Sequence, residues 1–327
     1  MAKIVGGIGC SHVPAVGAAH DHGKTENGYW SPLFAALPAA RKWIKDLAPD
    51  VLILVYNDHA SAFSLELIPT FAIGVAQWFE NADEGYGPRK IPDVEGHPEL
   101  AWHITESCIL DGFDLTIANK MDVDHGCSVP LTVFFGEPEA WPVKVIPICV
   151  NVIQYPPPTA KRCYDLGQAI RKAVEEYDGD LKVAIAGTGG MSHQLQGERA
   201  GVINTEFDVN YLNNLRDNND VNKNRSHLEY IREAGSEGIE LVMWQIMRGA
   251  MEDKVVEKFR KYHVASSNTA FGIICFENAP EEKTEAEVKA MKEPELVEYA
   301  NALGIKAHVD DLKKYTLEKV LTKLGYS

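Results

Sequence analysis

The sequence predicts an α/β protein in which a mixed β-sheet is flanked by helices. Short, almost wholly apolar runs alternate with longer stretches whose apolar residues recur at helical spacing. The clearest strands are predicted at residues 4–8, 51–56, 143–150 and 183–187, and the clearest amphipathic helix at 159–177. A chain of 327 residues can bury the large core that this architecture needs.

The remaining elements of the first half follow in order. Apolar residues on one helical face predict a helix at 33–47. A strand at 71–76 is expected to run antiparallel at an edge of the sheet. The polar residues 81–96, with their glycines and prolines, predict a long loop. A helix at 97–111 and a short strand at 115–118 are expected to complete this half.

The second half is less regular. Residues 199–225 are polar and rich in asparagine, which predicts short helices and loops. Residues 227–248 have helical spacing, but Gly235 and Gly238 are expected to break the helix and start a new one. The last core strand, with its lead-in, is predicted within residues 262–276.

A change of composition marks the C-terminal end of the chain. Residues 281–327 are rich in lysine and glutamate and have no strand pattern, and two small helices are expected at 294–303 and 310–324. We therefore predict one domain over residues 1–280 and a short helical extension over 281–327.

Composition and charge narrow the class of protein. The chain is 45% hydrophobic and 24% charged, as in a compact soluble protein. A net charge of −15 argues against nucleic acid or an anionic membrane as partner. No apolar run approaches the roughly 20 residues of a membrane helix, and no leader precedes the first strand, so a cytoplasmic protein is expected. None of the six cysteines forms a CxxC pair, which argues against a zinc-thiolate site or a disulfide framework.

Three of the predicted strands lead into a histidine. His12 follows the first strand, His59 the strand at 51–56, and His193 the strand at 183–187. Open α/β sheets gather their chemistry at the carboxyl ends of strands. A single histidine in such a place is usually a core residue bonded to a backbone carbonyl, but three of them indicate one shared site.

A fourth histidine has similar surroundings. His125 stands between an aspartate and a glycine, at an expected corner between a strand and a helix. Either Asp122 or Asp124 could bond one nitrogen of this imidazole and fix its tautomer. Among residues near the strand-end histidines, Asp58 is one expected partner for a metal-binding histidine.

Two histidines at strand ends with one carboxylate would form the facial triad of non-haem Fe(II) oxygenases. Three protein ligands leave positions for two substrate oxygens and O2. Spacing alone does not choose the carboxylate, because Glu229, Glu237 and Glu240 all lie in the helical region after residue 226.

Five short segments carry a more specific resemblance. They are residues 9–14 (GCSHVP), 57–59 (NDH), 124–126 (DHG), 190–194 (GMSHQ) and 237–240 (EGIE). Together and in this order they resemble the signature segments of the class III extradiol ring-cleaving dioxygenases. The resemblance is to the group of the protocatechuate 4,5-dioxygenase β-subunit, which includes gallate and 3-O-methylgallate dioxygenases, and it runs from about residue 3 to 280.

The resemblance implies a role for each of the motif residues. It implies that His12, His59 and Glu240 bind Fe(II), that His193 is the acid/base residue, and that His125 lies near the substrate hydroxyls or the oxygen. It also implies an α/β core with a mixed sheet. In the segment Ser267-Asn268-Thr269, it implies that Asn268 and Thr269 receive the ring carboxylate of the substrate.

The resemblance further implies a small aromatic substrate, cleaved with O2 in the catabolism of lignin-derived compounds. Protocatechuate enzymes of this group resemble a β chain with a separate small α chain over the site, whereas gallate-type enzymes resemble the same core with a helical domain fused. Here about 47 residues follow residue 280. This intermediate length favours a homo-oligomer, such as a homodimer, that acts on gallate or 3-O-methylgallate. An enzyme that needs a separate small α-type subunit is the less favoured alternative. The extension at 281–327 is expected to cover the active site or to form an oligomer contact.

Two other classes of function compete with this interpretation. A zinc-dependent hydrolase could use the same two histidines and carboxylate, with a water at the open position. A non-catalytic binding protein on the same fold would be expected to lack a ligand or the acid/base residue, and none is missing here.

Overall fold

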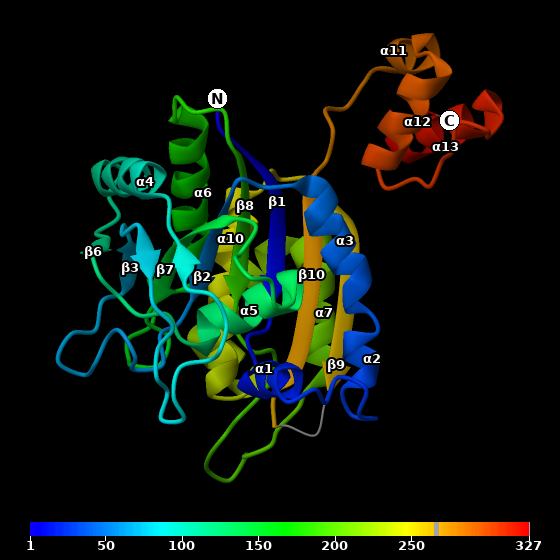
Figure 1. Cartoon of the computed structure of the whole chain (residues 1–327). Helices are drawn as coiled ribbons and strands as arrows, with labels where there is room; N and C mark the ends of the chain where they lie inside the picture. The colour runs from blue at the N-terminus through cyan, green and yellow to red at the C-terminus, as the bar shows by residue number, and fades with distance from the viewer. Residues whose placement is uncertain (265–267, 327) are drawn as a thin grey trace.

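The computed structural model describes residues 1–264 and 268–326, and Figure 1 shows their arrangement. Within them, an eight-stranded sheet has the order β6-β3-β7-β2-β8-β1-β10-β9. Its strands, in chain order, are β1 (Lys3–Cys10), β2 (Val51–Tyr56), β3 (Phe71–Gly74), β6 (Thr116–Ala118), β7 (Lys144–Val150), β8 (Lys182–Thr188), β9 (Val255–Val264) and β10 (Ala270–Asn278). A separate two-stranded sheet joins β4 (Trp78–Phe79) and β5 (Val94–Glu95).

The sheet is mixed, as predicted. Its four central strands β7, β2, β8 and β1 are parallel, whereas β10 pairs antiparallel with both β1 and β9, and β3 pairs antiparallel with β7. The register places Gly9 of β1 beside Gly187 of β8, which in turn lies beside Val55 of β2. The three strands that lead into His12, His193 and His59 are therefore neighbours that end at nearly the same level.

The strand predicted at 71–76 is antiparallel to β7, as expected, but the prediction that it lies at an edge was wrong, because β3 also pairs in parallel with the edge strand β6. The last core strand is confirmed as β10. The lead-in expected before it was wrong, because residues 262–264 end a further strand, β9, which forms the opposite edge of the sheet. The missed strand β9 is half-buried along its length and carries several charged residues. Charges protect an edge strand from further pairing, and they also hide it from a search for apolar runs.

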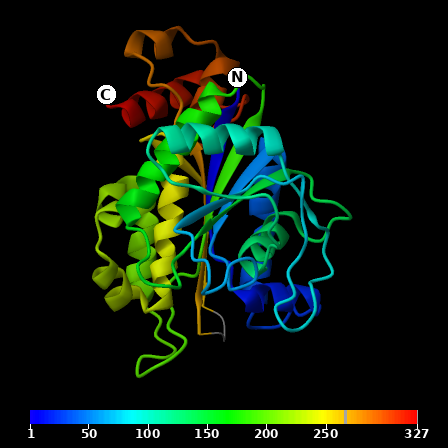
Figure 2. The same ribbon diagram turned by 90° about the vertical axis from the view of Figure 1, so that its left-hand side faces the viewer.

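Helices cover both faces of the sheet, and Figure 2 shows the sheet between the two layers. One layer contains α4 (Pro98–Leu110), α6 (Ala160–Glu176), α7 (Thr205–Asp217), α8 (Asn219–Lys223), α9 (His227–Ala234) and α10 (Trp244–Ala250). The other contains α1 (Pro14–Asp21), α2 (Ser31–Phe34), α3 (Leu37–Leu47) and α5 (His125–Phe135). All six cysteines are buried and free. No helix of the described residues is long and apolar enough to cross a membrane.

The helix break predicted at Gly235 is present, and it positions the carboxylate of Glu240. Helix α9 ends at Ala234, Gly235 follows with a φ of +91°, and a 3-10 helix, η1 (Glu237–Met243), leads into α10. Trp244 then packs directly over β1, where a Cβ atom on Gly9 would lie 2.3 Å from its ring. This close approach carries Glu240 to the ends of the central strands.

The C-terminal extension forms three short helices, α11 (Glu285–Ala290), α12 (Glu293–Ala302) and α13 (Lys313–Leu324). They share a small apolar core of their own that includes Val288, Leu296 and Val320. The extension leaves β10 at Asn278, whereas the His12 end of β1 lies beside the opposite end of β10. In Figure 1 the extension accordingly lies at the other end of the sheet from α1, which follows His12.

Helices α6 and α10 cross closely because glycines stand at the contact. A Cβ atom on Gly249 would lie 2.0 Å from the carbonyl oxygen of Tyr164. Gly249→Ala should therefore force the helices apart and lower the free energy of unfolding by about 1 to 3 kcal/mol, as measured by urea denaturation. Gly28→Ala is the control, because a Cβ atom there has no neighbour within 4 Å. Equal stability of the two variants would contradict this account of the crossing.

Candidate metal centre

The structure brings together five of the residues that the sequence singled out. His12 Nε2 lies 3.3 Å from Glu240 Oε2, and His193 Nε2 lies 3.9 Å from the same oxygen. The ring of His59 lies 5.3 Å from that of His12 between centroids, and the ring of His125 lies 3.9 Å from that of His59. These side chains come from the ends of β1, β2 and β8, from the start of α5 and from η1.

Each strand-end histidine is held through its Nδ1 atom. His12 Nδ1 bonds Thr188 Oγ1 at 2.9 Å, His59 Nδ1 bonds Asp124 Oδ2 at 3.0 Å, and a bond of 2.8 Å joins His193 Nδ1 to the carbonyl oxygen of Met191. A carboxylate or a carbonyl can only accept, so Nδ1 of His59 and of His193 carries the proton. In the neutral form of these two rings Nε2 then carries the lone pair, which is the state in which an imidazole binds a metal or accepts a proton.

Asp124 is a buried partner of His59 that the sequence assigned to a different histidine. Its Oδ2 atom accepts the backbone N–H of His59 at 2.6 Å as well as the ring N–H, and its Oδ1 atom accepts the N–H of Gly126 at 2.8 Å. As the N-cap of α5, Asp124 accepts the N–H of Gly126 and not a ring nitrogen of His125. The expected pairing of Asp122 or Asp124 with the His125 ring was therefore wrong, because Glu84 takes that place.

Asp58 was expected to bond a metal-binding histidine, but in the structure it bonds the backbone of the turn after His59. Its carboxylate accepts the backbone N–H groups of Ser61, Ala62 and Phe63 at 2.9 to 3.1 Å. Asp58 therefore shapes the turn after His59. Thr188 and Glu84 could not be predicted as histidine partners, since both are far from their partners along the chain.

Glu240 is a buried carboxylate in contact with histidines. Burial by itself would raise the pKa of Glu240, but attraction to His12, and more weakly to His193 and His59, lowers it below its ordinary value. Its Oε2 atom also accepts the N–H of Gly190 at 2.5 Å. Burial lowers the pKa of His12, against the opposing effect of Glu240. The pair therefore consists of a neutral imidazole and a carboxylate at neutral pH.

The donor atoms fit a divalent metal ion. His12 Nε2 is buried and, among the described residues, has no hydrogen-bond partner. A buried nitrogen in this state loses free energy unless something binds it. His59 Nε2 accepts a bond of 3.0 Å from Asn57 Nδ2, which a metal ion would replace. One nitrogen each from His12, His59 and His125 also lie within 4.8 Å of one another, so three histidines form a rival set to the two histidines with Glu240.

The residues expected to receive the ring carboxylate lie on the His193 side. Thr269 pairs with His193 in an isolated antiparallel bridge and is half-buried, whereas Asn268 is exposed. Ser267, the first residue of that segment, lies outside the described residues.

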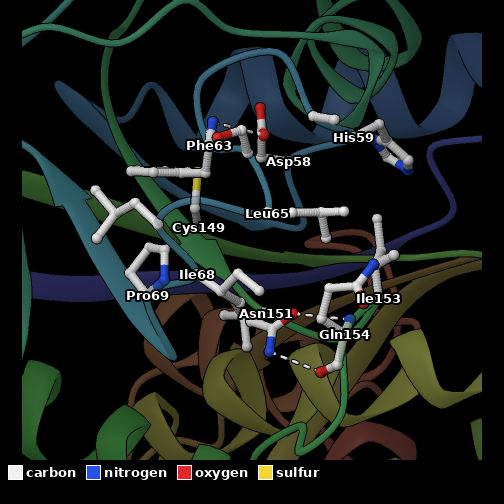
Figure 3. Close-up of a pocket in the computed structure, with 14 residues that line it drawn as sticks. Asp58, His59, Phe63, Leu65, Ile68, Pro69, Cys149, Asn151, Ile153 and Gln154 are labelled. Carbon is white, nitrogen blue, oxygen red and sulfur yellow. Dashed lines mark hydrogen bonds between the residues drawn. The ribbon is translucent and has the colours of Figure 1, made fainter.

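A cavity of about 380 Å³ opens on the other side, beside His59. Figure 3 shows His59 at one edge of it, with Cys149, Leu65, Ile68 and Ile153 around it. Its lining residues include no lysine or arginine. This cavity was not predicted, although the apolar residues Leu65, Leu67 and Ile68 in an expected loop were a usable signal.

The ion pair of Asp124 with His59 predicts a pH dependence of stability. Burial raises the pKa of Asp124, but the bond and the charge of His59 outweigh it and lower the pKa from 3.8 to about 2. A lowered folded-state pKa gives about 2 kcal/mol of stability above pH 3.8, which is lost as the pH falls toward 2. Asp124→Asn should therefore be less stable than wild type by about that amount at neutral pH, and the difference should shrink in acid.

Urea unfolding of the metal-free proteins from about pH 7 to about pH 3 measures this difference. Asp122→Asn is the matched control, since the structure places Asp124 and not Asp122 against His59. A difference that stays constant over this range would contradict the assignment.

Comparison with known proteins identifies the family of the chain. Residues 6–272 match the family of the catalytic LigB subunit of aromatic ring-opening dioxygenases. The chain is 42% identical over 197 residues to a gallate dioxygenase from Pseudomonas putida, covering 60% of this chain and 58% of that one. It is 32% identical over 160 residues to a 2,3-dihydroxyphenylpropionate/2,3-dihydroxicinnamic acid 1,2-dioxygenase from Mycobacterium sp. strain MCS, covering 49% of this chain and 48% of that one.

The chain thus spans about half the length of these relatives, 58% of the gallate dioxygenase and 48% of the dihydroxyphenylpropionate enzyme. A crystal structure of the uncharacterized protein JW3007 from Escherichia coli K12 shares the fold, with a TM-score of 0.52 at 13% identity over 83% of this chain and 99% of that one. The family match covers most of the chain, including all five segments that resemble the extradiol enzymes. The chain therefore belongs to the family of catalytic LigB subunits of aromatic ring-opening dioxygenases.

Proposed function

We propose that this chain is an Fe(II)-dependent extradiol dioxygenase that opens the ring of a catecholic acid with O2. The observation that supports this most is the meeting of His12, His59 and Glu240 around a buried imidazole nitrogen without a hydrogen bond, with His193 beside them. Two histidines and a carboxylate are the ligand set of non-haem Fe(II) oxygenases.

His12, His59 and Glu240 would hold the metal. When bound there, Fe(II) supplies positions for two substrate oxygens and O2 and carries electrons from the ring to the oxygen. Two neutral imidazoles and one carboxylate leave a net positive charge on such a centre. That charge favours a substrate bound as the catecholate anion, so one hydroxyl proton must leave when the substrate binds.

His193 is the residue that we expect to take this proton. Its Nδ1 atom donates to the carbonyl of Met191, so Nε2 is the nitrogen that can accept a proton, and it lies 3.9 Å from Glu240 Oε2. The imidazole would hold the proton at Nε2 and return it to the reacting oxygen as the ring opens. His125 would contact a substrate hydroxyl or the oxygen from the other side, next to His59.

The surroundings of the centre and the relatives support a substrate class. The lining of the cavity beside His59 is mostly apolar and includes the carboxylate of Asp58 but no lysine or arginine, so the ring carboxylate is expected on the Asn268 and Thr269 side instead. The similarity to a gallate dioxygenase supports gallate, 3-O-methylgallate or protocatechuate as substrate, in the breakdown of lignin-derived aromatic compounds. For the assembly we propose a homo-oligomer, with the extension at 281–327 as a contact.

Oxygen uptake by protein reconstituted with Fe(II) without air tests this function. One O2 should be consumed per ring with at least one of protocatechuate, gallate and 3-O-methylgallate. Glu240→Ala should retain less than a tenth of the iron, because a carboxylate ligand is lost, and should lose the uptake with it. Metal analysis gives the iron content. Stoichiometric zinc in the purified protein together with hydrolase activity would instead support the rival hydrolase function, and full iron occupancy in Glu240→Ala would move the ligand elsewhere.

His193→Phe separates proton transfer from metal binding. The variant should keep its iron, since His193 is not one of the proposed ligands, but turnover should fall about 10²- to 10⁴-fold with the loss of the proton acceptor. Iron content and oxygen uptake are measured on the same samples. His308→Phe, at an exposed position in the C-terminal extension, is the matched control. Unchanged turnover in His193→Phe would refute the acid/base assignment.

A further inference from the structure

Glu84 makes two contacts with a single residue of the centre. Its Oε2 atom accepts the backbone N–H of His125 at 2.9 Å, and its Oε1 atom forms a short hydrogen bond with His125 Nδ1. One carboxylate thus holds both the main chain and the ring of His125. Because a carboxylate accepts only, the proton lies on Nδ1 and the other ring nitrogen, Nε2, is left for the centre.

The loop that carries Glu84 is fixed on both sides of it. On the N-terminal side, the N–H of Ala82 donates to the carbonyl oxygen of Val123 at 2.9 Å. Within the loop, Asp83 Oδ1 accepts the N–H groups of Gly85 and Gly87, both at 2.8 Å. Both glycines have positive φ, +97° and +79°, so this tight turn suits glycine.

On the C-terminal side, Arg89 ties the loop to two helices. Its guanidinium makes two bonds, of 2.9 and 2.6 Å, with the carboxylate of Asp21 at the end of α1. A third bond of 3.2 Å runs from Nη1 to Ser128 Oγ in α5. Paired bonds of this kind fix orientation as well as distance. The loop therefore presents Glu84 to His125 in one arrangement.

The bond between Glu84 and His125 resembles the bonds that hold the two neighbouring imidazoles, since a protein oxygen atom is bonded to Nδ1 in each case. Thr188 bonds His12 Nδ1, Asp124 bonds His59 Nδ1, and Glu84 bonds His125 Nδ1. Asp124 and Thr188 are buried, whereas the Glu84 side chain keeps 30% of its surface exposed. Glu84 is thus the one of these three partners that can be replaced with little effect on the core.

We propose that Glu84 is a positioning residue for His125, whose carboxylate fixes the orientation and the tautomer of this imidazole so that Nε2 serves the reaction. This inference rests on the proposed function for its effect on turnover, but not for its effect on the tautomer. It assigns to the loop at 81–93 a part in the reaction that neither the family match nor the metal ligands require.

The first test reads the tautomer directly. In ¹⁵N-histidine-labelled, metal-free protein at about pH 8, long-range ¹H–¹⁵N correlation spectra report which nitrogen of each neutral imidazole carries the proton. The signal of His125 is identified by its loss in His125→Gln. The wild-type protein should show the proton on Nδ1, and Glu84→Ala should lose this preference. An unchanged His125 tautomer in Glu84→Ala would overturn the proposal.

The second test reads turnover in the Fe(II)-loaded enzyme. Glu84→Ala should lower kcat about 10- to 100-fold while KM and iron content stay near the wild-type values, and Glu84→Gln, which keeps one acceptor oxygen, should lie between. Glu80→Gln, at an exposed glutamate just before the loop, is the matched control for the lost charge. Equal losses in Glu80→Gln and Glu84→Gln would overturn the proposal. If the wild-type enzyme cleaves no catechol, the proposed function fails while the tautomer test still decides the role of Glu84.

Discussion

The level ends of three neighbouring parallel strands are the constraint on which the candidate site depends. At their carboxyl ends, strands β2, β8 and β1 are in register, with Val55, Gly187 and Gly9 side by side. His59, His193 and His12 follow these strands by a few residues each. A shift of one residue in either pairing would turn the side chains of a strand to the opposite face. Close packing of Trp244 on Gly9 and Gly187 opposes such a shift, because a Cβ atom at these positions would lie 2.3 Å and 2.7 Å from Trp244. Packing of the core therefore also sets the distances within the site.

The surroundings of the histidines show a division of labour between their two nitrogens. Oxygen atoms of the protein take Nδ1, and the opposite nitrogens face one another. The described residues leave His12 Nε2 and Asn57 Oδ1 buried without a hydrogen bond. Each such atom costs about 1 to 3 kcal/mol. A metal ion bound to His12 Nε2 would supply the missing interaction of that atom. Metal binding should therefore raise the free energy of unfolding.

How far the sequence predicts the site depends on whether the signal is local. The strand-end histidines were predictable, because each apolar run and its histidine are adjacent in sequence. Glu240 could not be separated from Glu229 and Glu237 by spacing, because a 3-10 helix interrupts the helical period there, and only the resemblance singled it out. The partner of His125 was misassigned because Asp124 caps its own helix. Strand β9 was missed because its charges conceal an edge strand.

The C-terminal extension has a small apolar core that is separate from the core around the sheet. Its apolar residues pack mostly on one another, and it joins the core next to β9 through Lys254 with Glu282 and through Val256 against Gly304. It also keeps Val309, Leu312 and Tyr315 exposed. Figure 1 shows the extension at the other end of the sheet from α1, which follows His12, so the extension lies away from the candidate site of its own chain.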